Sequence, residues 1–421
     1  MVDPTTRFLF EAGLTPARWC RVEGHTPAAY VSTCDVEVCV ALDGFGPPAD
    51  ERELDAPHRT LYYDIETLGL DPATSAVIQV ALVFRQGDAI ARHLVAVGTV
   101  ATIADTTVHV CSTEAALLTC VRALIVAHDP DFVVAYNGIN FDNRFLAERA
   151  RRLGVDDFLY LSRVALRPAR LRELSLQLGS GDNLIRYLDM HGRANFDWFL
   201  KLKRDLTSEP QYTLNHFGAT LCGLQKEDMA YQEIPTLQAG TAADRARLGS
   251  YCVWDAVLLV HLDDARGMLS EILQFATVFG VLPEWIYFRG QQVRIVAQLL
   301  YKARTAETVP LLLNRPPTGF YGEDTATFTG AVVNVPVKGF YKTPVACLDW
   351  ARLYPSIMVG HNLCYSTHIL DPATGAALAA TGAARTYNLP GGDTVYFATA
   401  ARKKGILPDI LEELHVARAR A

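Results

Sequence analysis

The sequence predicts an α/β fold, a mixed sheet flanked by helices, and three observations carry that prediction. Half of the 421 residues are apolar and a fifth are charged, which suits a folded protein with buried cores. Short apolar runs at residues 61–65, 77–84 and 132–136 are typical of buried strands. Helical patterns begin at Ser112 and at Asn143 and recur over residues 248–262. Strands that alternate with helices favour a three-layer α/β domain.

The flanking sequence predicts further segments, since a chain of this length holds about two to three domains. Residues 1–58 form a small α+β segment that ends in a polar, proline-containing linker at residues 46–51. The α/β domain takes residues 59–265, and a connecting region takes residues 266–340. Residues 341–421 begin another domain. It is expected to open with a strand at 345–349, to continue through a loop at 375–392 and to close with a helix at 407–420.

Composition excludes several classes of protein. No apolar run approaches the roughly 18 residues that cross a bilayer, and the N-terminus does not resemble a signal peptide. The nine cysteines form no C-x-x-C pair, so we expect reduced thiols in an intracellular protein. A net charge of −7 argues only weakly against a nucleic-acid partner, because DNA responds to the local field. Basic stretches exist, each of which could equally be a solvated face: Arg149, Arg151, Arg152; Arg163, Arg167, Arg170, Arg172; Lys201, Lys203, Arg204; Arg402, Lys403, Lys404.

Two carboxylates stand at the end of the first predicted strand. Asp64 and Glu66 are two residues apart, so both side chains project from the same side of that strand. A D-x-E triplet alone means little, since roughly one is expected by chance in a chain this acidic. Taken alone, the pair would be read as a surface feature.

Further acids strengthen the pattern. Asp142 follows the turn Asn137-Gly138-Ile139-Asn140-Phe141 at a strand-to-helix transition, where a helix N-cap is the alternative role. Tyr251 and Asp255 share one face of a helix at i and i+4. Hydrolysis of a phosphodiester typically uses two divalent cations about 3.5–4 Å apart. Asp64, Glu66, Asp142 and Asp255 would supply the oxygen ligands that Mg²⁺ prefers, and Tyr251 could hold the attacking water.

These three segments, in this order, resemble the Exo I, Exo II and Exo III motifs of DEDDy exonucleases. Their context resembles the family B DNA polymerases, particularly the delta-type and large-virus members. The resemblance extends to Gly192-Arg193 with Asp197, to residues 212–215 with Lys226, and to residues 289–294. It implies an RNase H-like 3′→5′ exonuclease domain with Asp64, Glu66, Asp142 and Asp255 on metal and Tyr251 in catalysis. It also implies that Asn137, Asn140 and Phe141 contact DNA.

Residues 348–357 resemble motif A of the same family, and residues 329–333 and 362–367 resemble its flanks. The resemblance implies that Asp349 ligates the catalytic metal ions and that Tyr354 excludes a ribose 2′-hydroxyl. It also implies that the backbone of Ala351, Arg352, Leu353 and Tyr354 cradles the nucleotide triphosphate. Trp350 replaces the usual Phe and Arg352 the usual Ser, and Arg352 could help by charge or block by volume.

The remaining polymerase motifs of the family do not occur in the sequence. We therefore expect a fragment or truncated reading frame that carries a complete exonuclease site and an incomplete α+β palm. The full-length protein would be a replicative DNA polymerase with proofreading, using two Mg²⁺ or Mn²⁺ ions per site. Its partners would be primer–template DNA, single-stranded 3′ ends and dNTPs; a processivity factor is not identifiable. Its place would be the nucleus or a viral replication site. A stand-alone DEDDy exonuclease and an inactive DNA-binding remnant are the alternatives.

Overall fold

The computed structural model describes residues 3–28, 31–48, 58–178, 181–225, 229–305, 335–389 and 392–420. The chain forms two compact units, an N-terminal unit, Met1–Arg294, and a C-terminal unit, Ile295–Ala421. The finer division at residues 58, 265 and 340 remains a prediction. Within the described ranges, no helix is both long enough and apolar enough to cross a membrane.

A six-stranded mixed sheet forms the centre of the N-terminal unit, in the order β12-β9-β5-β6-β7-β8. The central strands β5, β6 and β7 are antiparallel, and the pairs β5–β9, β9–β12 and β7–β8 are parallel. Strands β5, β6 and β9 match the three apolar runs predicted at residues 61–65, 77–84 and 132–136. The bounds are β5 Arg59–Thr67, β6 Val77–Gln86, β7 Ala89–Val97, β8 Thr107–Cys111, β9 Phe132–Ala135 and β12 Ala194–Asp197.

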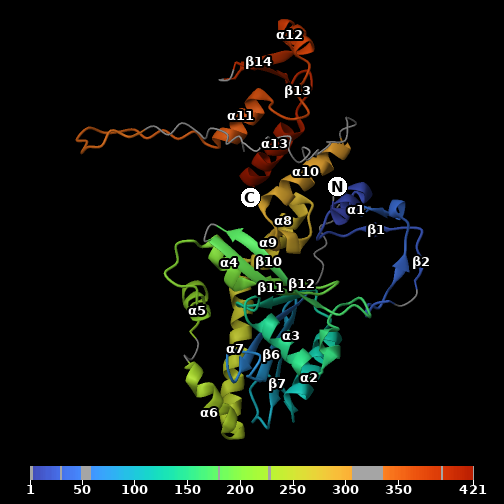
Figure 1. Ribbon diagram of the computed structural model, residues 1–421, viewed down its shortest axis with the longest axis vertical. Coiled ribbons are helices and arrows are strands. Elements are labelled where there is room, and N and C mark those ends of the chain that lie inside the picture. The colour runs from blue at the N-terminus through green and yellow to red at the C-terminus, as the bar shows by residue number, and fades with distance from the viewer. Residues whose placement is uncertain are drawn as a thin grey trace. The chain divides into compact units, whose positions relative to one another are not determined.

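Strand β5 presents two different faces to the helices around it. Helix α7, Ala242–Arg266, packs against β5, β6 and β7, whereas α2, Glu114–His128, and α3, Asp142–Arg152, lie on the other side of the sheet (Figure 1). Leu61, Tyr63 and Ile65 enter the core beneath α2 and α3. The alternate residues face α7, where the hydroxyl of Tyr62 donates to Asp263. The period of two therefore places Asp64 and Glu66 toward α7, on one side of the strand as predicted.

Local sequence explains where these helices begin and end. The side chain of Thr113 accepts the Ala116 N–H and starts α2. Thr241 and Asp244 form a reciprocal capping box that starts α7. Gly267 ends α7 in the left-handed conformation, with φ of 59°. Asp255 and its neighbours are thus carried on a helix of 25 residues that is fixed at both ends.

Smaller elements surround the sheet in the N-terminal unit. Residues before β5 form α1, Pro4–Ala12, and two small antiparallel pairs, β1 Arg21–Val22 with β4 Phe45–Gly46 and β2 Thr26–Pro27 with β3 Val38–Cys39. A two-stranded antiparallel hairpin, β10 Arg170–Leu178 and β11 Gly181–Asp189, follows α3. The other helices are α4 Trp198–Asp205, α5 Leu214–Cys222, α6 Ile234–Ala239, α8 Met268–Phe279 and α9 Pro283–Phe288. Helix α10, Gln291–Thr305, crosses into the C-terminal unit.

The C-terminal unit has its own core and sheet. Leu299, Cys364, Ile406 and Ile410 pack together. Asn362 is buried there, and its amide donates to the carbonyls of Ala398 and Lys403 while its Oδ1 accepts the Gly405 N–H. The elements are α11 Leu353–His361, α12 Pro372–Ala380, α13 Ile406–Arg420 and a sheet of β13 His368–Ile369, β15 Thr394–Ala398 and β14 Ala384–Asn388.

Two predictions for this unit are wrong. Residues 345–349 form no strand, because none of the described strands pairs with them and a strand needs a hydrogen-bonded neighbour. Residues 375–392 are not one loop, since α12 and β14 occupy much of them. The Asp371 side chain caps α12, and pairing with β15 fixes β14. The predicted helix at 407–420 is confirmed as α13. The flank at 329–333, Lys226 and residues 49–51 of the linker lie outside the described residues.

Candidate functional site

A cleft of about 260 Å³ lies where the end of β5 faces α7. The acids Asp64 and Glu66 reach it from β5, and Tyr251 and Asp255 reach it from α7. Phe141 adds an aromatic wall. Asp255 and Glu66 are buried, with exposures of 7% and 6%, so both carboxylates have lost most of their water. The structure therefore brings five of the predicted site residues, including Phe141, to one cavity.

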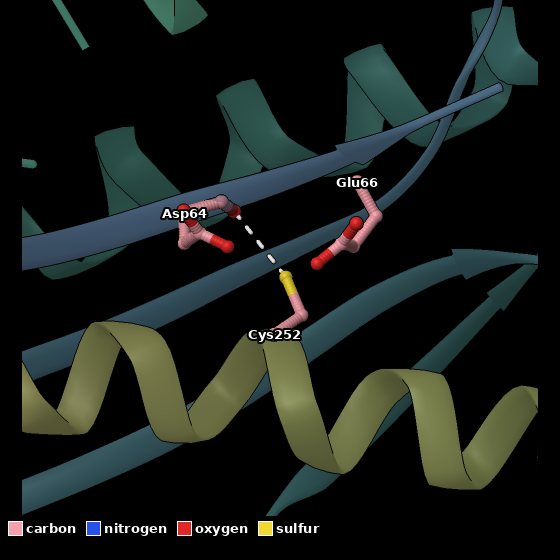
Figure 2. Close-up of side chains that lie close together, drawn as sticks. All are labelled: Asp64, Glu66 and Cys252. Atoms are coloured by element: carbon pink, nitrogen blue, oxygen red, sulfur yellow. Dashed lines mark hydrogen bonds between the residues drawn. The ribbon is translucent and has the colours of Figure 1, made fainter. Parts of the chain in front are cut away.

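Asp64, Glu66 and Cys252 form the tightest group in this cleft. One potential ligand atom from each lies within 4.8 Å of the other two. Figure 2 shows the two carboxylates beside the sulfur of Cys252, which rises from α7. The thiol donates a hydrogen bond to the backbone carbonyl of Asp64, with a sulfur–oxygen distance of 3.6 Å. No sequence pattern marks Cys252 as a site residue, because its place depends on how α7 packs against β5.

The chemistry of this group fits a hard cation. Burial, with the charges of Asp64, Glu66 and Asp255, raises the pKa of the Cys252 thiol well above its ordinary value. The thiol therefore stays protonated and acts as a hydrogen-bond donor. Carboxylate oxygens remain as the ligands, and these suit Mg²⁺ or Mn²⁺ better than a metal that prefers thiolate.

The turn between β9 and α3 carries the other predicted residues. Asn137 has a positive φ of 65°, and its carbonyl accepts the N–H groups of Asn140 and Phe141, each at 3.1 Å. The Asn140 side-chain amide donates to Asn137 Oδ1 at 2.8 Å. Asn140 is exposed, whereas Phe141 is half-buried and lines the cleft. The turn thus directs an aromatic ring into the cleft and an amide toward solvent.

Asp142 is the first residue of α3 and is 5% exposed. It is not the N-cap: Phe141 holds that position and makes no side-chain cap bond, so the capping alternative is wrong. Burial and the nearby charge of Asp197 raise the pKa of Asp142 above its ordinary value. Asp142 does not line the cleft that holds Asp64, Glu66, Tyr251 and Asp255.

Asp197, at the end of β12, is a further buried acid that the sequence singled out only by resemblance. Its carboxylate is fully buried and accepts backbone N–H groups from the turn and from α4. Burial raises the pKa of Asp197 to about 6, and the backbone N–H groups limit the rise. The sequence could not assign the bonds to the turn, because they join residues about 60 positions apart.

The residues of the predicted nucleotide site in the C-terminal unit are mostly exposed to solvent. Trp350 and Tyr354 are 70% and 64% exposed, and Asp349 is exposed as well. Among the described residues, Asp349 belongs to no group of three or more potential metal ligands. Arg352 has a left-handed φ of 57°, and α11 begins at Leu353, so Ala351 to Tyr354 lie at a helix N-terminus. Amides at such an end can receive phosphate oxygens.

Several of the basic residues are engaged in ion pairs. Arg149 pairs with Glu114 at 2.5 Å, and Arg163 pairs with Asp129 at 2.8 Å. Lys201 is buried between two acids of α4 and α8. Lys404 pairs with two acids of α13. At these four positions the charge is neutralised locally, which favours a structural role.

Comparison with known proteins gives the class of protein. Residues 1–217 match "DNA polymerase family B, exonuclease domain", and residues 282–421 match "DNA polymerase family B". The chain therefore belongs to the family B DNA polymerases, whose members bind DNA and use divalent metal ions.

Within that family, the chain is similar to DNA polymerase delta catalytic subunits. It is 36% identical to that of Dictyostelium discoideum over 99% of this chain, and 33% identical to that of Caenorhabditis elegans over 96%. It is 34% identical to that of Bos taurus over the whole of this chain. The chain spans 37–38% of the length of these three relatives.

Proposed function

We propose that the N-terminal unit is an RNase H-like DEDDy exonuclease that removes nucleotides from the 3′ end of DNA. One observation carries the proposal: Asp64, Glu66, Tyr251 and Asp255 line a single cleft, although they come from distant parts of the chain. The match of residues 1–217 to a polymerase exonuclease domain supports the same reaction. In a longer polymerase, this activity would proofread newly made DNA.

Each residue then has a chemical role. Asp64, Glu66, Asp142 and Asp255 would hold two Mg²⁺ or Mn²⁺ ions, which supply a reactive water and stabilise the leaving oxygen. The Tyr251 hydroxyl would orient that water from α7. Phe141 would pack against the terminal base, since aromatic rings stack on any base. Asn137 and Asn140 would bind the strand by hydrogen bonds from their amides.

We propose a polymerase role only for a longer protein that includes this chain. Asp349 would bind metal there, with dNTPs over the α11 N-terminus and Tyr354 as the gate against ribose. Primer–template DNA and a nuclear or viral replication site follow from the same analogy. The 421 residues alone would not extend a primer, because Asp349 by itself does not supply enough ligands for a two-metal polymerase site.

The test is a gel assay on a labelled primer–template with a 3′ mismatch, in Mg²⁺ or Mn²⁺, with and without dNTPs. We expect stepwise shortening that dNTPs do not convert into extension. The double substitution Asp64→Ala, Glu66→Ala should reduce shortening by at least about 10³-fold, because it removes two of four metal ligands.

Asp88→Ala is the matched control, since Asp88 is an exposed acid in the β6–β7 turn of the same sheet. It should shorten the primer at the unmodified rate. Full shortening by the Asp64→Ala, Glu66→Ala variant would sink the assignment. No shortening by the unmodified chain in either metal would favour an inactive DNA-binding remnant.

A further inference from the structure

Asp197 makes more hydrogen bonds than a helix cap requires. Its Oδ1 accepts the N–H groups of Phe199 at 2.9 Å and Leu200 at 3.3 Å, which is the ordinary N-cap pattern for α4. The same carboxylate also accepts two N–H groups from the turn before α3. These are Asn137, at 2.9 Å to Oδ1, and Ile139, at 3.1 Å to Oδ2. Capping explains the first pair of bonds and leaves the second pair unexplained.

The turn that Asp197 holds is sterically tight. Asn137 adopts a left-handed φ, which is uncommon for a residue with a side chain. A Cβ added at Gly138 would lie 2.5 Å from Ala135 Cβ and 3.0 Å from Asp142 Oδ2. Such a conformation persists only where surrounding groups impose it. Two N–H groups directed at one buried carboxylate supply that constraint.

The 137–139 turn also sets the positions of residues in the candidate site. Its carbonyls accept the N–H of Phe141 and, at 2.9 Å from Gly138, the N–H of Asn143. Phe141 lines the cleft, and Asp142 lies between these two bonded residues. A shift of the turn would therefore move both the aromatic wall and the Asp142 carboxylate.

A further contact fixes Asp197 itself. The buried hydroxyl of Tyr287, on α9, donates to the Asp197 backbone carbonyl. The acid is thus held from β12 and α9 while it holds the turn and α4.

We propose that Asp197 is a positioning residue of the exonuclease site, which holds the 137–139 turn so that Phe141 and Asp142 take their places. It acts through the turn and does not touch the reacting atoms. The proposal rests on the exonuclease function proposed above.

The first experiment measures amide hydrogen exchange in the metal-free 421-residue chain. Asp197→Asn keeps the size and shape of the side chain but replaces Oδ2 with an NH₂ group. The Ile139 N–H then faces a second donor and loses its hydrogen bond. We expect exchange at Ile139 to accelerate at least about tenfold. Thr113→Ala is the control, because it removes an N-cap bond from a different helix, α2.

The second experiment measures the kinetics of 3′-nucleotide removal with the same variants. Loss of an outer partner of a metal site typically costs about 10- to 100-fold in activity. We expect kcat to fall by about that factor for Asp197→Asn, with KM for DNA within about threefold of the unmodified value. Asp197→Ser keeps an oxygen for Phe199 and Leu200 but is too short to hold both turn amides, so it should show the same losses.

The outcomes separate this proposal from the one on which it rests. An inactive unmodified chain would refute the exonuclease function, and the exchange experiment would still decide the role of Asp197. Unchanged protection of Ile139 in Asp197→Asn would overturn the positioning role, as would an equal fall of kcat in Thr113→Ala. If Asp197→Asn does not fold, Asp197→Ser carries both comparisons.

Discussion

Glu284 shows how one residue can link stability to pH. Its side chain is half-buried at the start of α9, and its carboxylate accepts the N–H of Asn195 at 3.3 Å. Burial first, and then the charge of Asp189, raise the pKa of Glu284 to about 7. Because the folded pKa lies above the unfolded value, this group's stability contribution is full below about pH 4.5. It is lost as pH rises through about 7.

We therefore predict that Glu284→Gln stabilises the chain at pH 8 by on the order of 2 kcal/mol. The amide oxygen can still accept the Asn195 N–H, and no buried charge forms. The gain should shrink toward zero by pH 4.5, as measured by urea unfolding across that range. Glu23→Gln, at an exposed position, should show no such trend. A gain that does not change with pH would contradict the assignment.

At the scale of elements, a partly buried ionic cluster joins the end of α2 to the segments that lead into β9 and β12. Asp129 ends α2 and accepts bonds from Arg163 at 2.8 Å and from Arg193 at 2.7 Å. The Arg193 side chain is fully buried and also donates to the carbonyls of Leu161 and Pro130. Without Arg193, Asp129 would keep its pairs with Arg163 and Arg59, but the carbonyls of Leu161 and Pro130 would lose a buried hydrogen-bond donor.

Arg193→Met should accordingly destabilise the N-terminal unit by about 2–4 kcal/mol, because two buried carbonyl groups lose their hydrogen-bond donor. Arg172→Met is the control: its pair with Asp189 is half exposed, and such pairs contribute about 0–1 kcal/mol. Urea midpoints of the two variants give the comparison. Equal, small losses would show that the cluster contributes no more than a surface pair.

The same scale shows what the sequence could predict. The strands β5, β6 and β9 and the helix that carries Asp255 have strong local patterns, and all four were predicted. β7, β8 and β12 were missed, as was the β10–β11 hairpin. In β10 and β11, charged residues such as Arg172, Glu173 and Arg186 interrupt any apolar run. Their pairing depends on cross-strand bonds, which no single segment encodes.

The candidate site divides in a similar way. Asp64, Glu66, Tyr251 and Asp255, which line the cleft, were predicted because each stands on a recognisable strand or helix. Asp142 was predicted with them but does not line the cleft. Cys252 and the two bonds from Asp197 to the amides of Asn137 and Ile139 were not, since both depend on how distant elements pack. The wrong prediction of a strand at 345–349 has the same cause. The apolar run there is a local pattern, but a strand also needs a hydrogen-bonded partner strand, which a local pattern does not reveal.

At the scale of the whole molecule, the two units have separate cores. The N-terminal core lies beneath α2 and α3, and the C-terminal core surrounds Cys364. We predict two thermal transitions, since multi-domain chains commonly depart from two-state unfolding. Mn²⁺ should raise the transition of the N-terminal unit by roughly 2–5 °C, because a ligand stabilises the state that binds it. Calorimetry measures both transitions.

The Asp64→Ala, Glu66→Ala variant is the control for that measurement. It should keep two transitions and lose the response to Mn²⁺. Equal upward shifts of both transitions, or a shift that survives the substitutions, would show that the ion binds elsewhere.

The distance along the chain between β5 and α7 also has a consequence in time. Asp64 and Cys252 are bonded partners 188 residues apart. A ribosome adds about 5–20 residues per second, so α7 is synthesised roughly 10–40 s after β5. During that interval the acidic end of β5 has no covering helix. The nascent protein is therefore expected to acquire its nuclease cleft late and in one step, when α7 docks.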